Sequence, residues 1–130
     1  MSATQNTLVS ISPAAEKALF GWPQWTAIDS EINSPCTATA AVKAGYSNAT
    51  SHVTVSFSQP AATALELQIL DGSSVIWQVE IGAGILTMTE NFETRPLAGN
   101  VGNALSAVIG AAGTSVTQTV AMAGFWVKGA

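Results

Sequence analysis

The clearest regularity along the chain is a period of two, in which apolar and polar residues alternate. Residues 52–57 show it well, because one side of this run is apolar and the other side carries His52, Thr54 and Ser56. Successive side chains of a strand point to opposite faces, so this spacing is typical of a strand with one buried face. We therefore predict a half-buried strand over 52–57, with His52 on its outer face.

A hairpin is predicted over residues 63–81. Leu65, Leu67 and Ile69 alternate with polar residues, and Asp71-Gly72 then supplies two residues that tolerate the left-handed backbone of a tight turn. The same period resumes after the turn, where we expect four core residues: Val75, Trp77, Val79 and Ile81. The hairpin is the best-defined element that the sequence predicts.

Other elements are less sharply bounded. The patterns predict further strands over 7–11, 22–28, 36–43, 85–90, 103–109 and 114–122, of which 36–43 is alanine-rich enough to be a helix instead. Gly124 suggests a bulge before residues 125–127. One short helix is expected near residues 13–20, between an N-cap at Ser12 and a stop at Gly21.

Together these elements predict the fold class. Eight to ten short strands separated by Gly, Pro and Asn turns indicate an all-β fold, a two-sheet antiparallel sandwich of jelly-roll type. We expect a single β-sandwich domain over residues 1–130, in which residues 1–12 form an extended arm or an edge strand.

The amino-acid composition indicates that the protein associates with other protein chains. Only 9% of the residues are charged, and 13 Ser and 14 Thr supply most of the polar groups. Interface cores are depleted of charge because an unpaired buried charge is costly to desolvate. The net charge is −4 and the few cations are scattered, which argues against nucleic acid and against membrane attachment as partners. The composition therefore predicts a protein that associates with other protein, beginning with copies of itself.

Residues that could carry chemistry are few. His52 is the single histidine and Cys36 the single cysteine, and neither has a partner at the spacing of a catalytic triad or a zinc site. We expect His52 to be a surface residue, Cys36 to be a small buried one, and the chain to have no catalytic residues, no metal and no cofactor. Asp29 and Glu31 alternate with Asn33, but the glycine and terminal glutamate of an EF-hand loop are absent.

One aromatic pair stands out as a candidate contact. Trp22 and Trp25 flank Pro23 and Gln24, and tryptophan is enriched where proteins bind partners. The pair can equally cap one end of the core, because tryptophan is large and often only partly buried. Trp22 and Trp25 are therefore the candidate residues for a partner or a sugar.

The second half of the chain resembles small structural proteins of tailed bacteriophages. The resemblance lies in residues 70–77 (LDGSSVIW), in residues 95–105 (RPLAGNVGNAL) and in the Gly/Ala/Thr-rich alternation up to Phe125-Trp126-Val127. It covers about sixty residues and is a matter of texture rather than of one motif. It implies a β-sandwich that decorates capsids or builds head and tail appendages, often as a trimer.

This resemblance sets the functional expectation. It implies a capsid decoration or cement protein that binds the major capsid protein or another virion protein and stabilises the assembled head by mass action. It also implies a virion location, reached by assembly in the bacterial host cytoplasm, and residues 1–7 lack the pattern of a signal peptide. Two alternatives stay open: a carbohydrate-binding jelly-roll module that stacks sugars on Trp22 or Trp25, with Asp29 or Glu31 as calcium ligands, and a tail or baseplate subunit.

Overall fold

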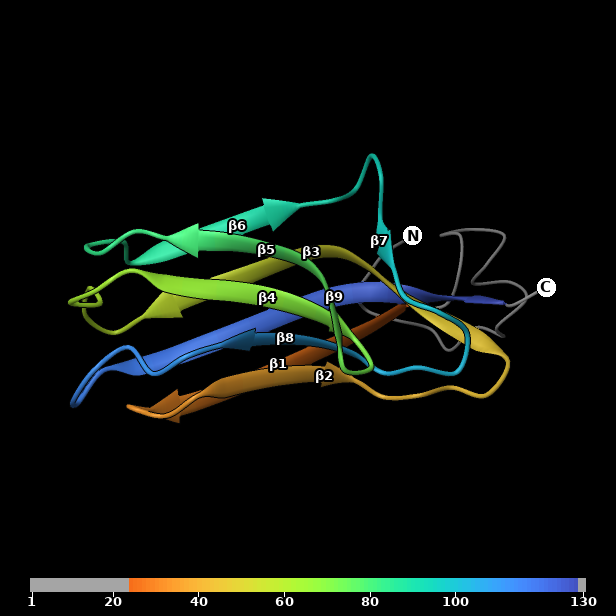
Figure 1. Cartoon of the computed structure of the whole chain (residues 1–130). Helices are drawn as coiled ribbons and strands as arrows, with labels where there is room; N and C mark the ends of the chain where they lie inside the picture. The colour runs from red at the N-terminus through yellow and green to blue at the C-terminus, as the bar shows by residue number, and fades with distance from the viewer. Residues whose placement is uncertain (1–23, 129–130) are drawn as a thin grey trace, which may run out of the picture.

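The computed structural model describes residues 24–128 of the chain, and these residues form two antiparallel sheets packed face to face (Figure 1). The strands in chain order are β1 (Gln24–Ile32), β2 (Cys36–Ala40), β3 (Tyr46–Phe57), β4 (Leu65–Asp71), β5 (Ser74–Ile81), β6 (Thr87–Asn91), β7 (Leu97–Ala98), β8 (Leu105–Ile109) and β9 (Thr117–Lys128). One sheet has the order β1-β9-β3-β6, with β7 paired to β3, and the other has the order β2-β8-β4-β5.

The strand order is that of a jelly roll. Four pairs are nested, so that β1 pairs with β9, β2 with β8, β3 with β6 and β4 with β5. Such nesting arises when one long hairpin is rolled up, and the roll also brings β9 beside β3 and β8 beside β4. The predicted fold class, an all-β antiparallel sandwich of jelly-roll type, is confirmed.

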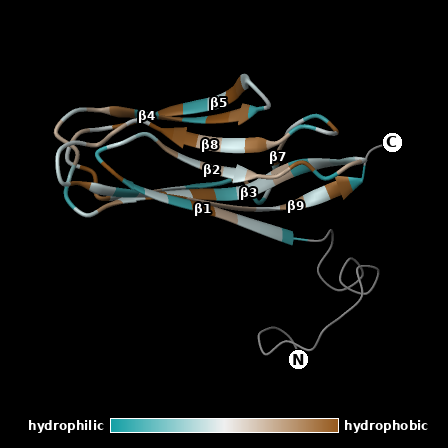
Figure 2. Cartoon of the chain, turned by 90° about the horizontal axis from the view of Figure 1, so that it is seen from below, coloured by the Kyte–Doolittle hydropathy of each residue, from teal (hydrophilic) through white to brown (hydrophobic). Residues whose placement is uncertain are grey.

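The core lies between the two layers, which Figure 2 shows nearly edge-on. Alternation places one residue in two on the inner faces, and the largest fully buried side chains include Leu67, Ile69, Leu105, Ile109 and Met122. Trp77 is partly buried at the margin of this core, and its ring meets that of Phe92 edge-on, with 5.2 Å between centroids. Within residues 24–128, no helix is long and apolar enough to cross a membrane.

The hairpin was predicted correctly except at its tip. Asp71 still pairs with Ser74, and the turn consists of Gly72 and Ser73, one residue later than expected. The register also shifts between Ile69 and Leu70, so Val75 faces outward and is 46% exposed instead of joining the core. The extra residue on β5 reverses the inward parity there, which alternation alone does not reveal.

The bulge predicted at Gly124 lies on the neighbouring strand instead. β9 runs without interruption through Gly124, while the register of β3 against it shifts between Thr50 and His52. A Cβ at Gly124 would overlap the Ala49 carbonyl oxygen and approach Trp25 Cζ2 to 2.6 Å. Glycine is therefore needed for close approach of three strands, not for a break in β9.

The remaining boundaries moved by a few residues. The alanine-rich run forms a strand that ends at Ala40, the strand containing His52 begins earlier at Tyr46, and β7 was not predicted. The expected strand over 7–11, the helix near 13–20 and the arm of residues 1–12 lie outside the described residues.

Candidate functional site

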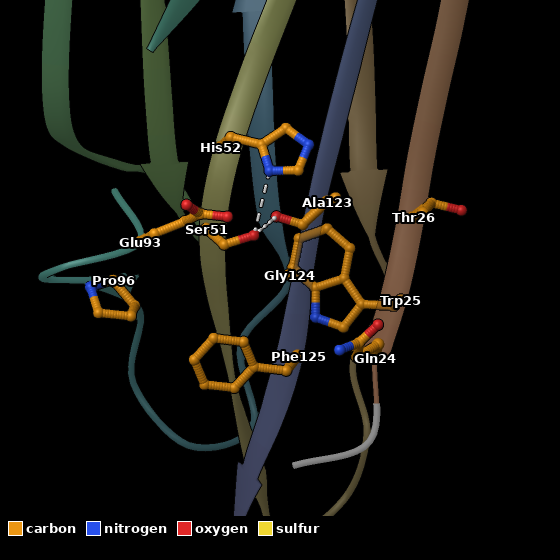
Figure 3. A pocket seen from close by; sticks show the side chains of 10 residues that line it. All are labelled: Gln24, Trp25, Thr26, Ser51, His52, Glu93, Pro96, Ala123, Gly124 and Phe125. Atoms are coloured by element: carbon orange, nitrogen blue, oxygen red, sulfur yellow. Dashed lines mark hydrogen bonds between the residues drawn. The ribbon is translucent and has the colours of Figure 1, made fainter. Parts of the chain in front are cut away.

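A pocket of about 570 Å³ opens where β1, β9 and β3 meet the loop after β6 (Figure 3). β1 contributes residues 24–26, β9 residues 123–125, β3 the two residues at its bulge, and the loop Glu93 and Pro96. Phe125 and Pro96 form an apolar end, whereas Glu93 and His52 supply polar groups (Figure 3). Its volume lies in the range of small-molecule sites, but half of its lining residues are polar (Gln24, Thr26, Ser51, His52 and Glu93), so it is more polar than most such sites.

The β3 bulge directs two hydroxyl groups to one carbonyl and places an imidazole beside one of them. The Ala123 carbonyl oxygen accepts hydrogen bonds from Thr50 Oγ1 at 2.8 Å and from Ser51 Oγ at 3.2 Å, and Ser51 Oγ lies 3.3 Å from His52 Nδ1. When Ser51 gives its one hydroxyl proton to the Ala123 carbonyl, it can only accept a hydrogen bond from His52 Nδ1, in the imidazole tautomer that carries a proton there. A serine nucleophile needs the opposite direction of proton transfer.

The structure places the two candidate tryptophans differently. Trp25 is 8% exposed, and its ring covers Gly124 at one end of the core while forming a wall of the pocket. Its Nε1 is buried and has no hydrogen-bond partner among residues 24–128. Trp22 lies outside the described residues, and the role of both tryptophans as contacts stays a prediction.

Cys36 and Asp29 join β1 to β2 across the edge of the sandwich. Cys36 Sγ donates to the Asp29 carbonyl oxygen at 3.0 Å, and burial raises the pKa of this thiol to about 11. The Asp29 carboxylate accepts a hydrogen bond from the Thr37 backbone N–H at 3.0 Å, which lowers the pKa of that carboxyl group. Within residues 24–128, no three His, Cys, Asp or Glu residues gather closely enough to hold a metal ion.

The outer face of the β1-β9-β3-β6 sheet carries no formally charged side chain at its centre. We call this surface the uncharged face and define it by three cross-strand rows with one residue from each strand. The rows are Thr26, Ala123, His52 and Asn91; Ile28, Ala121, Thr54 and Thr89; and Ser30, Thr119, Ser56 and Thr87. His52 lies on this outer face as predicted.

Apolar and hydroxyl groups share the uncharged face. Ile28 is 71% exposed there, and Ile32 continues the same side of β1 at 65%. Two pairs of hydroxyls bond across strands, Ser30 Oγ to Thr119 Oγ1 at 2.6 Å and Thr54 Oγ1 to Thr89 Oγ1 at 3.1 Å. Such pairing lowers the cost of removing these groups from water.

Charged groups of the described residues lie elsewhere. The opposite sheet carries Glu66 and Glu80 directly across from each other on its outer face. Asp29 and Glu31 occupy the other side of β1, at the free edge of its sheet. Lys43 lies over the rings of Tyr46 and Trp126, 5.1 and 5.2 Å from their centroids.

Comparison with known proteins adds little to this geometry. No family model and no curated protein matches the chain. Among solved structures, the chain is similar to one in the X-ray crystal structure of tomato aspermy virus, with a TM-score of 0.35 and 7% identity over 85% of this chain and 80% of that chain. A similarity at this level carries no argument about function, so the jelly-roll assignment rests on the strand order of the chain itself.

Proposed function

We propose that the chain is a non-enzymatic structural protein of a virion, which binds the assembled shell as a decoration or cement protein in a symmetric homo-oligomer. The uncharged face is the observation that carries the proposal. A surface of four strands without a charged side chain, in a chain with net charge −4, is suited to being covered by protein. Jelly rolls recur in capsid proteins and in lectins, so the fold is compatible with this role without selecting it.

A shell-binding role predicts how the protein distributes among particles. Lysates of cultures that make the chain would be cleared, treated with nuclease and separated on a density gradient, and each fraction probed with an antibody to the purified protein. We expect the chain to peak with genome-filled particles and the antibody to label their surface in electron micrographs. A chain that stays with unassembled protein at the top of the gradient contradicts the proposal, and label confined to tails supports the tail or baseplate alternative instead.

A second function, binding of a neutral saccharide, is favoured by the pocket beside Trp25. The pocket combines the aromatic residues Trp25 and Phe125 with Gln24, His52 and Glu93 and has no cation among its lining residues, which suits an uncharged ligand better than a phosphate.

Saccharide binding is tested by titrating neutral mono- and oligosaccharides while following tryptophan fluorescence. We expect saturable quenching that Phe125→Ala weakens at least about tenfold, because the apolar end of the pocket is lost. Trp22→Ala and Trp25→Phe would show which indole reports the binding. Absence of saturable quenching by any sugar up to millimolar concentration contradicts this second function and leaves the first unaffected.

A further inference from the structure

The uncharged face has both a knob and a hole. Ile28 projects from β1 with 71% of its surface exposed. Beside it lies a hollow of about 260 Å³, with Ala121 and Ala123 at its base and His52 and Thr54 on the far side. The hollow exists because β9, which carries small residues here, lies between β1 and β3, which carry larger ones.

We propose that two copies of the chain pack their uncharged faces together about a two-fold axis, with Ile28 of each copy in the Ala121/Ala123 hollow of the other. An isologous contact requires a patch that complements itself, so that residue i meets residue j and j meets i. A knob and a hole on one face meet that requirement. Apolar and hydroxyl groups complement copies of themselves, whereas a differently charged partner would call for charge on this face.

Electrostatics favours this face over the other surfaces for self-association. Two copies of a chain with net charge −4 repel each other wherever carboxylates meet. Pairing through the outer face of the other sheet would oppose Glu66 and Glu80 of both copies, and pairing along the free edge of β1 would bring together Asp29 and Glu31 of both. Charged residues beside a free edge are a common defence against edge-to-edge pairing.

The whole outer surface of this sheet, which has the uncharged face at its centre, is large enough for a stable dimer. A nine-residue β1 in a four-strand layer spans roughly 30 Å by 19 Å at ordinary strand spacings. Two copies would therefore bury on the order of 1,200 Å², which is the lower end of stable protein–protein interfaces. Twisted sheets pack face to face at about −30°, so sheet geometry allows the contact.

The inference concerns the oligomer alone and holds whether or not the protein belongs to a virion. The resemblance to phage proteins favours three copies, whereas an isologous contact gives two copies or another even number. The full chain would be measured by multi-angle light scattering over a tenfold concentration range reaching about 100 μM. We expect a dimer or a larger even oligomer. A monomer overturns the inference, in which case residues 1–23 or a different protein occupies the face, and a trimer overturns it as well.

Substitutions on the two sheets identify the surface. Ile28→Lys would bury an unpaired charge at the proposed contact, and we expect it to raise the dimer dissociation constant at least about 100-fold. Val75→Lys is the matched control, because Val75 is also an exposed β-branched residue on an edge strand, but of the other sheet. Equal dissociation constants for the two variants would overturn the inference. Should Ile28→Lys fail to fold, Ser30→Lys and Thr39→Lys form a second pair, since each removes an exposed hydroxyl bonded to one on the neighbouring strand.

Two further variants test the knob and the hole directly. Ala121→Phe fills the hollow with an apolar side chain. If the two faces were held together only by general apolar contact, this change would not weaken the dimer. If Ile28 of the other copy occupies the hollow, the phenylalanine blocks it, and we expect the dimer to weaken at least about tenfold. Ala121→Cys places a thiol beside the two-fold axis, while Cys36 stays unreactive because it is fully buried. We expect a short bis-maleimide to link Ala121→Cys covalently into dimers and to leave Thr39→Cys without a crosslink. An undiminished dimer in Ala121→Phe, or equal crosslinking of both cysteine variants, would overturn the proposed packing.

Discussion

At the scale of single residues, Gly124 shows how one position is fixed by three strands. Any Cβ there would overlap the Ala49 carbonyl oxygen, lie 2.8 Å from Thr50 Cα and meet the ring of Trp25. Two of these atoms belong to the backbone of β3, which cannot move without breaking its ladder to β9. Gly124 therefore has a steric role, and its backbone angles are not among the positive φ values of the chain.

Gly124→Ala is expected to lower the free energy of unfolding by at least about 2 kcal/mol, because overpacking against backbone has no low-energy relief. Urea denaturation followed by tryptophan fluorescence measures the change. Gly82→Ala is the control, since a Cβ at Gly82 meets nothing within 4 Å and its effect should stay within about 1 kcal/mol. Equal effects of the two substitutions would show that the close approach of β1, β9 and β3 is not as tight as described.

At the scale of elements, Asp71 holds the loop after β7 against the end of β4. Its carboxylate accepts hydrogen bonds from the Asn100 backbone N–H at 3.1 Å, from Asn100 Nδ2 at 2.8 Å and from Asn103 Nδ2 at 3.0 Å. Asp71 is mostly buried, and the loop leads directly into β8. The aspartate thus fixes how the chain re-enters the second sheet.

Asp71→Ala leaves three donors without an acceptor, and we expect it to lower the free energy of unfolding by about 3 kcal/mol. Glu66→Ala, on the same strand but solvent-exposed, should change stability by less than about 0.5 kcal/mol. Hydrogen exchange would locate the loss, which should appear first at the amides of Gly99 and Asn100, because they bond to the Asn48 carbonyl and to Asp71. Unchanged protection of these amides in Asp71→Ala would contradict the assigned role.

The sequence predicted strands well where alternation was long and poorly where two strands lose register. The clean alternation of residues 52–57 and 65–69 located β3 and β4, and Gly72 marked the turn between β4 and β5 to within one residue. Both register shifts escaped prediction, because a bulge depends on the partner strand and not on the strand's own pattern. The exposed position of Val75 is the direct consequence.

The candidate sites were predictable in different degrees. The pocket brings Gln24, Ser51, Glu93 and Phe125 together from four separate segments, and no local motif marks them. The uncharged face did leave a trace in the sequence, because the alternate residues from 24 to 32 and from 117 to 127 include no Asp, Glu, Lys or Arg. Only the strand order shows that these two runs, with His52 and Thr54, share one surface.

At the scale of the whole molecule, the two outer faces differ in kind. One sheet presents apolar and hydroxyl side chains, and the other presents opposed carboxylates at Glu66 and Glu80. This asymmetry gives the molecule one surface suited to burial and one suited to solvent. The composition indicated that charged residues are few, and the fold determines which surface lacks them.

The central position of β9 has a consequence for folding during synthesis. Among the described strands β9 is made last, yet it lies between β1 and β3, so neither of these strands has its principal neighbour until β9 has been synthesised. The nascent chain must therefore wait, with the apolar sides of both strands uncovered, for a segment about ninety residues away from β1. Pairings between such distant segments form slowly, since a long loop has to close before any contact is gained. Because the chain carries little charge to oppose aggregation, a chaperone that shields the uncovered strands would act before β9 is available to cover them.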